Sequence, residues 1–314
     1  MARKADFWDF LFLLRPTLMM PVWMFLFYGY FHGMDGRILH PIFPKSWAFW
    51  CIFVALTAIS GSAYVVNQIV DIETDRINKK LFLLPEGIIP VKAAWLVVVG
   101  LSIFGLVLGA FCGRLPFLLL LTIWIFGFLY SVRPFRFKGR PFIDLIWNAL
   151  GYGLLTFALG FWAAKGSLAG FFRLSVPFML AVGATYAETT IPDIPGDLRD
   201  SAYTTGVILK PFATALLALG LMAASFAISL IVRVFTVSIA SGLSLPGFLW
   251  AAMTNDPEQI DMRSRVAFRL AGVFFALVIG IHCPIYIAIG IVVYFGLKRY
   301  YKTRFGLDYP SLRG

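Results

Sequence analysis

Long apolar segments constrain this chain more than any other feature of its sequence. About nine can be drawn, and most reach the length of about 20 residues that a membrane-spanning helix needs. Of the 314 residues, 60% are hydrophobic and 14% are charged, whereas soluble domains carry about 25% charged residues. The sequence therefore predicts an all-α integral membrane protein with helices near 17–34, 47–69, 92–112, 115–131, 142–165, 174–192, 210–232, 234–253 and 271–297. We expect one polytopic membrane domain over residues 1–314 and no separate soluble domain.

The distribution of basic residues predicts the orientation. With the N-terminus inside, 16 of the 27 Lys and Arg residues fall on the inner side of the segments, six on the outer side and five in the C-terminal tail. The positive-inside rule then places the N-terminus on the cytoplasmic side of a cell inner membrane. An odd number of spans puts the basic tail outside. Either nine is the wrong count near the C-terminus or the tail is an exception, and we favour the exception.

The net charge of +11 suits basic loops that face an anionic leaflet or an anionic substrate. The basic residues are divided among short loops, which disfavours nucleic acid as a partner. Within segment 234–253, Pro246 is a candidate position for a kink or a break.

A row of polar residues closes the second apolar segment. Asn67, Asp71 and Asp75 are spaced four residues apart, so on a helix they lie along one face with about 40° of drift per step. Carboxylates beside a membrane segment are costly, and a divalent cation is the simplest physical reason for them. The alternative is a solvated loop in which the aspartates pair with Arg76 or Lys79.

The sixth segment ends in a second pair of aspartates with the same spacing, Asp193 and Asp197. We expect Pro192, Pro195 and Gly196 to interrupt the helix and to place the carboxylates on an irregular turn. The stretches after segments two, four, six and eight have the same parity, so they emerge on one side of the membrane. Two acidic motifs on one face favour a metal site over a chance pair of acidic loops.

Basic residues after the fourth segment supply the counterpart to these carboxylates. Arg133, Arg136, Lys138 and Arg140 fall within eight residues. They suit a diphosphate group, which Lys binds as a point charge and Arg as a fork, although an ordinary positive-inside loop has the same composition. Oxygen ligands select Mg²⁺, which uses one or two carboxylates, waters and substrate phosphate. The separated acidic motifs therefore suggest more than one Mg²⁺ ion bridged by a diphosphate.

Four further residues have two interpretations each. Asp200 either forms a salt bridge with a neighbour such as Arg199 or joins the metal ligands. Glu188 either contacts the substrate or is buried with a structural partner. Tyr64 and Tyr186 lie within about a turn of the acidic motifs. They are candidates to stabilise a carbocation by cation–π attraction, and packing between helices is the alternative.

Together these motifs resemble the UbiA-type intramembrane prenyltransferase superfamily. The resemblance rests on Asn67-x-x-x-Asp71-x-x-x-Asp75 and Asp193-x-x-Gly-Asp197, supported by Arg15-Pro16-Thr17, Tyr130-Ser131-x-x-Pro134-x-x-x-Lys138 and Leu84-Pro85-x-Gly87. It implies a nine-helix bundle around a central cavity with a lateral opening to lipid. It also implies an active site closed by loops on the cytoplasmic side.

The resemblance further implies an enzyme that transfers a prenyl group from a polyprenyl diphosphate to an aromatic, quinone-precursor-like acceptor with Mg²⁺ as cofactor. By position, the catalytic and metal-binding residues are Asp71, Asp75, Asp193 and Asp197, with Asn67 assisting. Lys138 and Arg133 would contact the diphosphate. Arg76 and Lys79, beside the first motif, have the same two interpretations as the basic loop and join Asn67 among the predicted diphosphate contacts.

Other functions remain open at this point. An enzyme on the same scaffold could instead transfer the prenyl group to a lipid or a tetrapyrrole, or cyclise it. A transporter also uses intramembrane carboxylates, but it predicts them near the midplane and predicts related halves of the chain. Here the motifs lie at segment ends. The sequence identifies neither the acceptor, nor the prenyl chain length, nor the oligomeric state.

Overall fold

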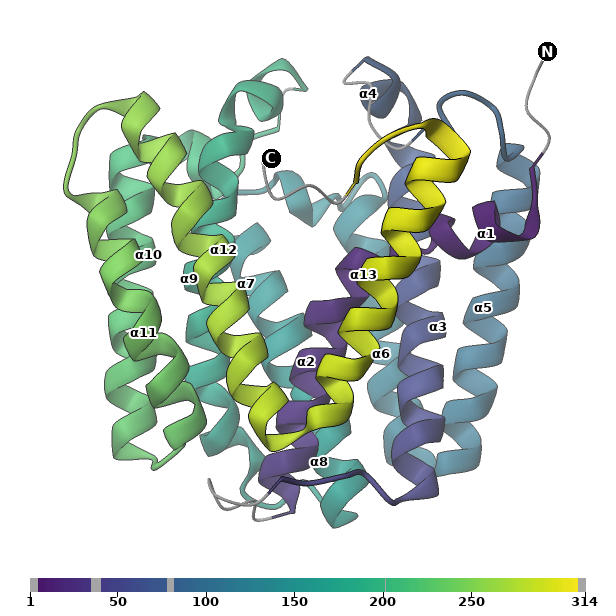
Figure 1. Cartoon of the computed structure of the whole chain (residues 1–314), viewed down its shortest axis with the longest axis horizontal. Helices are drawn as coiled ribbons and strands as arrows, with labels where there is room; N and C mark the ends of the chain where they lie inside the picture. The colour runs from purple at the N-terminus through teal and green to yellow at the C-terminus, as the bar shows by residue number, and fades with distance from the viewer. Residues whose placement is uncertain (1–4, 35–40, 78–81, 201, 310–314) are drawn as a thin grey trace.

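The structure is a bundle of long α-helices (Figure 1). This computed structural model describes residues 5–34, 41–77, 82–200 and 202–309, and within them there is no strand, so the predicted all-α class is confirmed. Two short elements, η1 and η2, are a 3₁₀-helix and a π-helix. The elements in chain order are α1 (Phe7–Leu13), α2 (Pro16–Gly33), α3 (Trp47–Val70), α4 (Ile72–Ile77), α5 (Val91–Cys112), α6 (Arg114–Ser131), η1 (Phe137–Gly139), α7 (Ile143–Asn148), η2 (Ala149–Thr156), α8 (Phe157–Lys165), α9 (Phe171–Arg199), α10 (Thr205–Ile231), α11 (Phe235–Ala252), α12 (Pro257–His282) and α13 (Pro284–Phe305).

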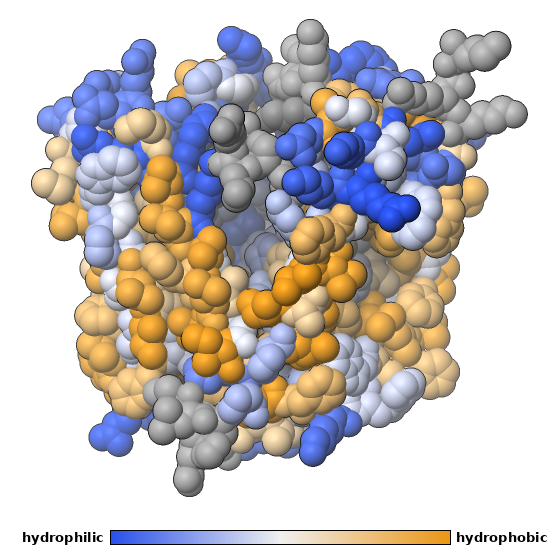
Figure 2. All heavy atoms as spheres, viewed as in Figure 1, coloured by the Kyte–Doolittle hydropathy of each residue, from blue (hydrophilic) through white to orange (hydrophobic). Residues whose placement is uncertain are grey.

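Apolar helices long enough to cross a membrane make up most of the bundle. Among the described residues, seven helical stretches qualify by length and composition, and α1 with α2, which meet at a 52° bend, would make an eighth. The helices α9 and α13 are 29 and 22 residues long, but they are less apolar and do not belong to this group. Figure 2 shows a broad band of apolar side chains with polar side chains above and below it. The predicted count of nine is therefore approximate.

The last predicted segment, 271–297, is wrong because it joins the end of one helix to the start of the next. The chain turns at Cys283, which has φ −132° and ψ 78° and separates α12 from α13. Pro284 opens α13, and a proline disfavours helical backbone at the residue before it. The C-terminal end of α13 therefore returns to the end of the bundle that carries α1 (Figure 1). Of the two explanations for the basic tail, the structure supports a different helix count.

The predicted irregular turn at the second acidic motif is also wrong. The helix α9 continues through Pro192 and Pro195 as far as Arg199. Proline's fixed φ suits a helix, and both prolines lie in its last three turns, where a lost backbone hydrogen bond is tolerated at the exposed helix end. Because the helix is continuous, Asp193 and Asp197 lie on one face of it. The helix α11 is likewise continuous through its proline.

Two glycines allow α2, in the middle of the bundle, to cross α8 at close range. A Cβ added to Gly160 would lie 1.9 Å from the carbonyl oxygen of Leu26, and one added to Gly29 would lie 2.0 Å from that of Phe157. Leu26 and Phe157 are fully buried at the crossing. Small residues at such crossings let the backbones of membrane helices touch. The crossing fixes α2 against α8.

We expect Gly160→Ala to destabilise the protein, because the backbone of α2 must move to admit the methyl group. Overpacking of this kind costs about 1–3 kcal/mol. The matched control is Gly272→Ala in α12, where nothing lies within 4 Å of an added Cβ. There alanine is expected to raise stability slightly, because its helix propensity exceeds that of glycine by up to about 1 kcal/mol. Thermal unfolding midpoints in detergent compare the two, and a Gly160→Ala midpoint at or above wild type would contradict the close crossing.

Candidate active site

A cavity of about 510 Å³ lies at the end of the bundle that carries α4 and the C-terminal end of α13. Four charged residues line it, and each comes from a different part of the chain: Arg15 before α2, Asp71 after α3, Lys138 in η1 and Asp193 in α9. Figure 2 shows that this face of the molecule is hollowed beneath its polar rim. The stretches after the second, fourth and sixth apolar segments therefore meet at one end of the bundle, as their shared parity predicts.

Asp71 and Lys138 form an ion pair at this cavity. Their side chains are only 16% and 17% exposed, so water screens the pair weakly. Asp71 ends α3, and its N–H donates to the carbonyl of Asn67 at 3.1 Å. The N–H of Asp75 donates to the carbonyl of Asp71 at 2.8 Å, so a near-helical path continues into α4. Asp71 thus pairs with a lysine distant in sequence, whereas Arg76, one of the two partners named in the solvated-loop alternative, pairs with Glu73.

The amide of Asn67 is oriented by a hydrogen bond across two helices. Its Nδ2 donates to the Oγ of Ser131, at the end of α6, over 3.1 Å. Ser131 is buried, and both residues line the cavity beside Asp71. This bond ties the first acidic motif to the helix that leads into the Lys138 loop.

The second acidic motif places two carboxylates one helical turn apart near the C-terminal end of α9. Asp193 lines the cavity, and Asp197, one turn later, accepts a hydrogen bond from Thr204 Oγ1 at 2.8 Å. Burial raises the pKa of Asp197 to about 6; the bond from Thr204 lowers it, and the charges of Asp193 and Asp200 raise it. A bound cation would neutralise this cluster.

Asp144 is an acidic residue that the sequence analysis did not single out. It is fully buried at the start of α7, and it accepts hydrogen bonds from the N–H of Thr205 at 2.9 Å and from the Thr205 hydroxyl. It therefore holds the start of α10 in place, close to Asp197. The sequence signal that could have identified Asp144 is its position as a single acidic residue within an apolar segment. Burying such a carboxylate costs free energy unless it forms polar contacts.

Two residues that were predicted to contact the diphosphate lie outside the lining of the cavity. Arg76 pairs with Glu73 at 2.6 Å, and both side chains are largely exposed. Arg133 is also exposed, and together with Arg136 and Arg140 it borders a separate surface pocket of about 560 Å³. Neither Arg76 nor Arg133 lines the cavity. Their contact with a diphosphate stays a prediction.

Other predicted residues lie beside the cavity or beyond it. Asp75 and Asp197 follow the lining aspartates by one turn and do not line the cavity themselves. Lys79 lies outside the described residues. Glu188 is fully buried in α9 and does not line the cavity either. Both interpretations of Glu188 stay open, since its carboxylate is buried outside this cavity and neither oxygen forms a hydrogen bond with a described residue.

Four tyrosine hydroxyls form two hydrogen-bonded pairs near the charged residues. Tyr64 donates to the carbonyl of Leu18 at 3.0 Å and lies 3.1 Å from the hydroxyl of Tyr152, in the π-helix η2. Because Tyr64 has a single proton, Tyr152 is the donor in this pair. Tyr130 lies 3.4 Å from the hydroxyl of Tyr186. Tyr64 and Tyr130 line the cavity, whereas Tyr186 stands behind Tyr130.

The carboxylates fit a metal that leaves room for other ligands. Among the described residues, no three His, Cys, Asp or Glu side chains lie close enough to hold an ion by themselves. Mg²⁺ does not need such a cage, because it takes one or two carboxylates and completes its shell with water and phosphate. Asp71 and Asp193 offer one carboxylate each to the same cavity.

Comparison with known proteins identifies the family. The model of the UbiA prenyltransferase family matches residues 18–278. The chain belongs to this family. Its fold is similar to that of a UbiA homolog from Archaeoglobus fulgidus, with a TM-score of 0.69 and 21% identity, covering 90% of this chain and 98% of that one. The structure of a UbiA homolog from the same organism bound to GPP and Mg²⁺ matches with a TM-score of 0.60 and 21% identity, covering 87% and 99%.

Curated relatives of this protein are found in plants and archaea. It is 31% identical over 199 residues to a probable homogentisate phytyltransferase 2 of Oryza sativa, covering 58% of this chain and 52% of the relative. It is 25% identical over 228 residues to a digeranylgeranylglyceryl phosphate synthase of Korarchaeum cryptofilum, covering 68% and 76%. The chain thus spans about half the length of the plant relative. Its apolar helices and its family make it an integral membrane protein.

Proposed function

We propose that this protein transfers a prenyl group from a prenyl diphosphate to an aromatic acceptor, with Mg²⁺ as cofactor. The observation that supports this best is the convergence of Arg15, Asp71, Lys138 and Asp193 on one cavity whose remaining walls are largely apolar and aromatic. Cations and carboxylates together suit a diphosphate with its metal ions, and apolar walls suit an isoprenoid chain.

The four charged residues that line the cavity would drive ionisation of the prenyl diphosphate. As the allylic carbon–oxygen bond breaks, its electron pair leaves with the diphosphate, and the ammonium of Lys138 and the guanidinium of Arg15 stabilise the added charge. Asp71 and Asp193 would hold Mg²⁺, with Asp75, Asp197 and Asn67 close behind. When bound, the metal supplies Lewis-acid stabilisation of the diphosphate oxygens.

The walls would then protect the allylic cation until the acceptor attacks. The rings of Tyr64, Tyr130 and Tyr152 line the cavity, and so do Phe126 and Trp147, which stack with ring centroids 3.9 Å apart. Aromatic faces stabilise a cation, and apolar walls exclude the water that would quench it. A ring carbon of the acceptor forms the new bond to the allylic carbon, and the ring proton is released.

An aromatic acceptor is favoured over a lipid acceptor by this aromatic wall, which can stack on a planar ring. Relatives of both kinds exist, because plant phytyltransferases and archaeal digeranylgeranylglyceryl phosphate synthases match this chain. The purified protein should be incubated with Mg²⁺, a series of prenyl diphosphates, and either phenolic acceptors or a glyceryl phosphate lipid, with products identified by mass spectrometry. Carbon-prenylated phenol supports the proposal. A prenylated lipid or a cyclised hydrocarbon would instead support one of the alternative reactions. The absence of any diphosphate release would exclude an enzyme of this class.

We further propose that the cavity opens on the cytoplasmic side of a cell inner membrane. The C-terminal end of α13 lies at the same end of the bundle as the charged residues of the cavity. It carries Lys298, Arg299, Lys302 and Arg304. With the tail on that side, the basic residues follow the positive-inside rule without an exception. A reporter fused to the C-terminus should be accessible only from the cytoplasm.

A further inference from the structure

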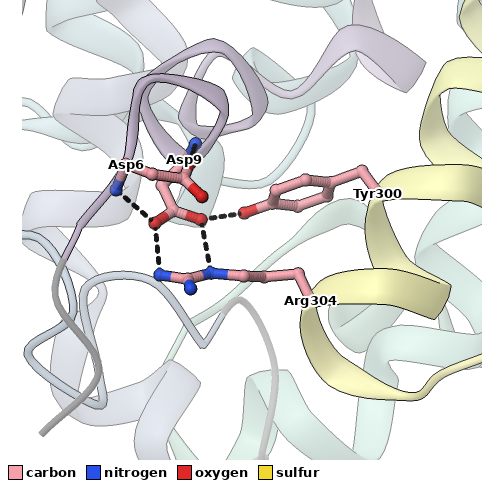
Figure 3. A network of polar contacts seen from close by, with 4 residues as sticks. All are labelled: Asp6, Asp9, Tyr300 and Arg304. Atoms are coloured by element: carbon pink, nitrogen blue, oxygen red, sulfur yellow. Dashed lines mark hydrogen bonds and ion pairs between the residues drawn. The ribbon is translucent and has the colours of Figure 1, made fainter.

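The short helix α1 is fastened to the end of α13 by a buried carboxylate that the proposed chemistry does not use. Asp9 is fully buried and accepts hydrogen bonds from the N–H of Asp6 at 2.9 Å and from the hydroxyl of Tyr300 at 2.6 Å. The guanidinium of Arg304 donates to it twice, at 3.0 and 2.7 Å (Figure 3). Four donors on one buried carboxylate, two of them from a charged fork, make a strong and directional contact.

This contact joins segments that are far apart in the sequence. The side chains of Ile291, Val292 and Phe295, in the middle of α13, are exposed. Polar bonds hold α13 near both of its ends, through Asp9 at one and through the bond from Tyr286 to the carbonyl of Met20 at the other, over 3.3 Å. The hydrogen bonds of Asp9 therefore join α1 to the C-terminal end of α13.

From Asp9, a short path of contacts leads to the cavity. The ring of Phe12, one turn along α1, stacks on Tyr300 with centroids 3.8 Å apart. The carbonyl of Phe12 accepts a hydrogen bond from the N–H of Arg15 at 3.1 Å, and the carbonyl of Leu13 accepts one from Gln68 in α3 at 2.7 Å. Gln68 directly follows Asn67, so α1 is braced against the first acidic motif.

Arg15, at the end of this path, has an unfavourable backbone conformation. Its φ of 54° and ψ of 65° lie in the left-handed region, which costs a non-glycine residue about 1–2 kcal/mol. Such a conformation persists only where the surroundings hold it, and it is found preferentially at functional sites. Here the conformation places Arg15 at the turn between α1 and α2, where its side chain lines the cavity with Asp71 and Lys138.

We propose that Asp9 is a positioning residue that acts through Arg15. By fixing α1 to α13, it holds Arg15 in the wall of the cavity, and it thereby sets the affinity for the diphosphate group of the donor. This role rests on the proposed function, because it assumes that the cavity binds a diphosphate. Asp9 itself lies outside the cavity and touches no substrate.

The test measures binding of inorganic diphosphate with Mg²⁺ to the purified full-length protein by calorimetry, together with KM and kcat for the prenyl diphosphate. We expect Asp9→Asn to weaken binding and raise KM by about tenfold, with kcat changed by less than about twofold, because coupled residues interact by up to a few kcal/mol. Arg15→Ala should have a similar effect. In the double variant the two effects should not multiply, because Asp9 acts only through Arg15.

Controls separate positioning from mere stabilisation. Asp261→Asn breaks an exposed pair with Arg265 in α12, and it should leave binding and KM unchanged. Should Asp9→Asn fail to fold, Tyr300→Phe removes one hydrogen bond but keeps the stack, and a rise in KM of about two- to threefold is expected. Unchanged binding in a folded Asp9 or Tyr300 variant, or effects that multiply in the double variant, would overturn the inference alone. A wild-type protein that binds no diphosphate would overturn the proposed function as well.

Discussion

Prenyl transfer is expected to be abolished when either Asp71 or Asp193 is replaced by alanine, a loss of about a thousandfold or more. Each residue supplies a carboxylate to the cavity from a different acidic motif. Removing one leaves the metal–diphosphate assembly without a ligand on that side, and the remaining carboxylate cannot replace it from another helix. Turnover should be measured at saturating Mg²⁺ and donor, so that a weaker affinity is not mistaken for a lost chemical step.

The same variants are expected to remain folded, because both side chains face the cavity and neither fills the core. A thermal unfolding midpoint in detergent close to wild type would establish this. Asp261→Ala, which removes an exposed carboxylate from α12, is the matched control and should retain full activity. Near wild-type turnover in either Asp71→Ala or Asp193→Ala would rule out the metal assignment.

Replacing Lys138 with glutamine is expected to lower kcat/KM by about a hundredfold. The ammonium forms an ion pair with Asp71, and the diphosphate gains charge in the step that Lys138 would stabilise. Lys138→Arg keeps the charge and should retain much more activity, although its fork cannot reproduce the point charge of lysine. Lys298→Gln removes an exposed cation from α13 and serves as the control.

The Lys138 substitution has a second expected result that does not depend on turnover. In the wild-type structure the ammonium neutralises Asp71, so it competes with a metal ion for that carboxylate. Without substrate, Lys138→Gln should therefore bind Mg²⁺ more tightly than wild type, whereas Asp71→Ala should bind it less tightly. Titration calorimetry on both variants measures this. Weaker Mg²⁺ binding in Lys138→Gln would show that the lysine does not compete for the site.

The location of the acidic motifs followed from the sequence because it depends on length and polarity alone. A membrane admits only segments of a narrow length range, so counting them fixes which connections share a side. That count held through the first eight segments, and it correctly predicted that Asp71, Lys138 and Asp193 lie at one end of the bundle. It failed near Cys283, because the turn there carries no charged residue and only His282 and Pro284 interrupt the apolar run.

The partners of the charged residues could not be predicted in this way. Arg76 pairs with Glu73 and leaves Asp71 to Lys138, although Arg76 is much nearer to Asp71 in sequence. Local spacing says which residues share a helix face, but not which side chain from another helix reaches that face. The continuity of α9 through Pro192 shows the same limit. A proline removes one backbone hydrogen bond, and the surroundings of the helix determine whether that loss breaks the helix.

The sequence by itself determined the class of protein, the end of the bundle that carries the chemistry, and the residue types that would meet there. These properties follow from hydrophobic length and from spacing along a helix, which each segment carries independently of the others. Only the tertiary structure decided that Arg15 lines the cavity from a left-handed turn, that Lys138 neutralises Asp71, and that Asp9 fastens α1 to α13 across the whole length of the chain. Those contacts join residues that lie far apart in the sequence, so they arise only when the helices pack.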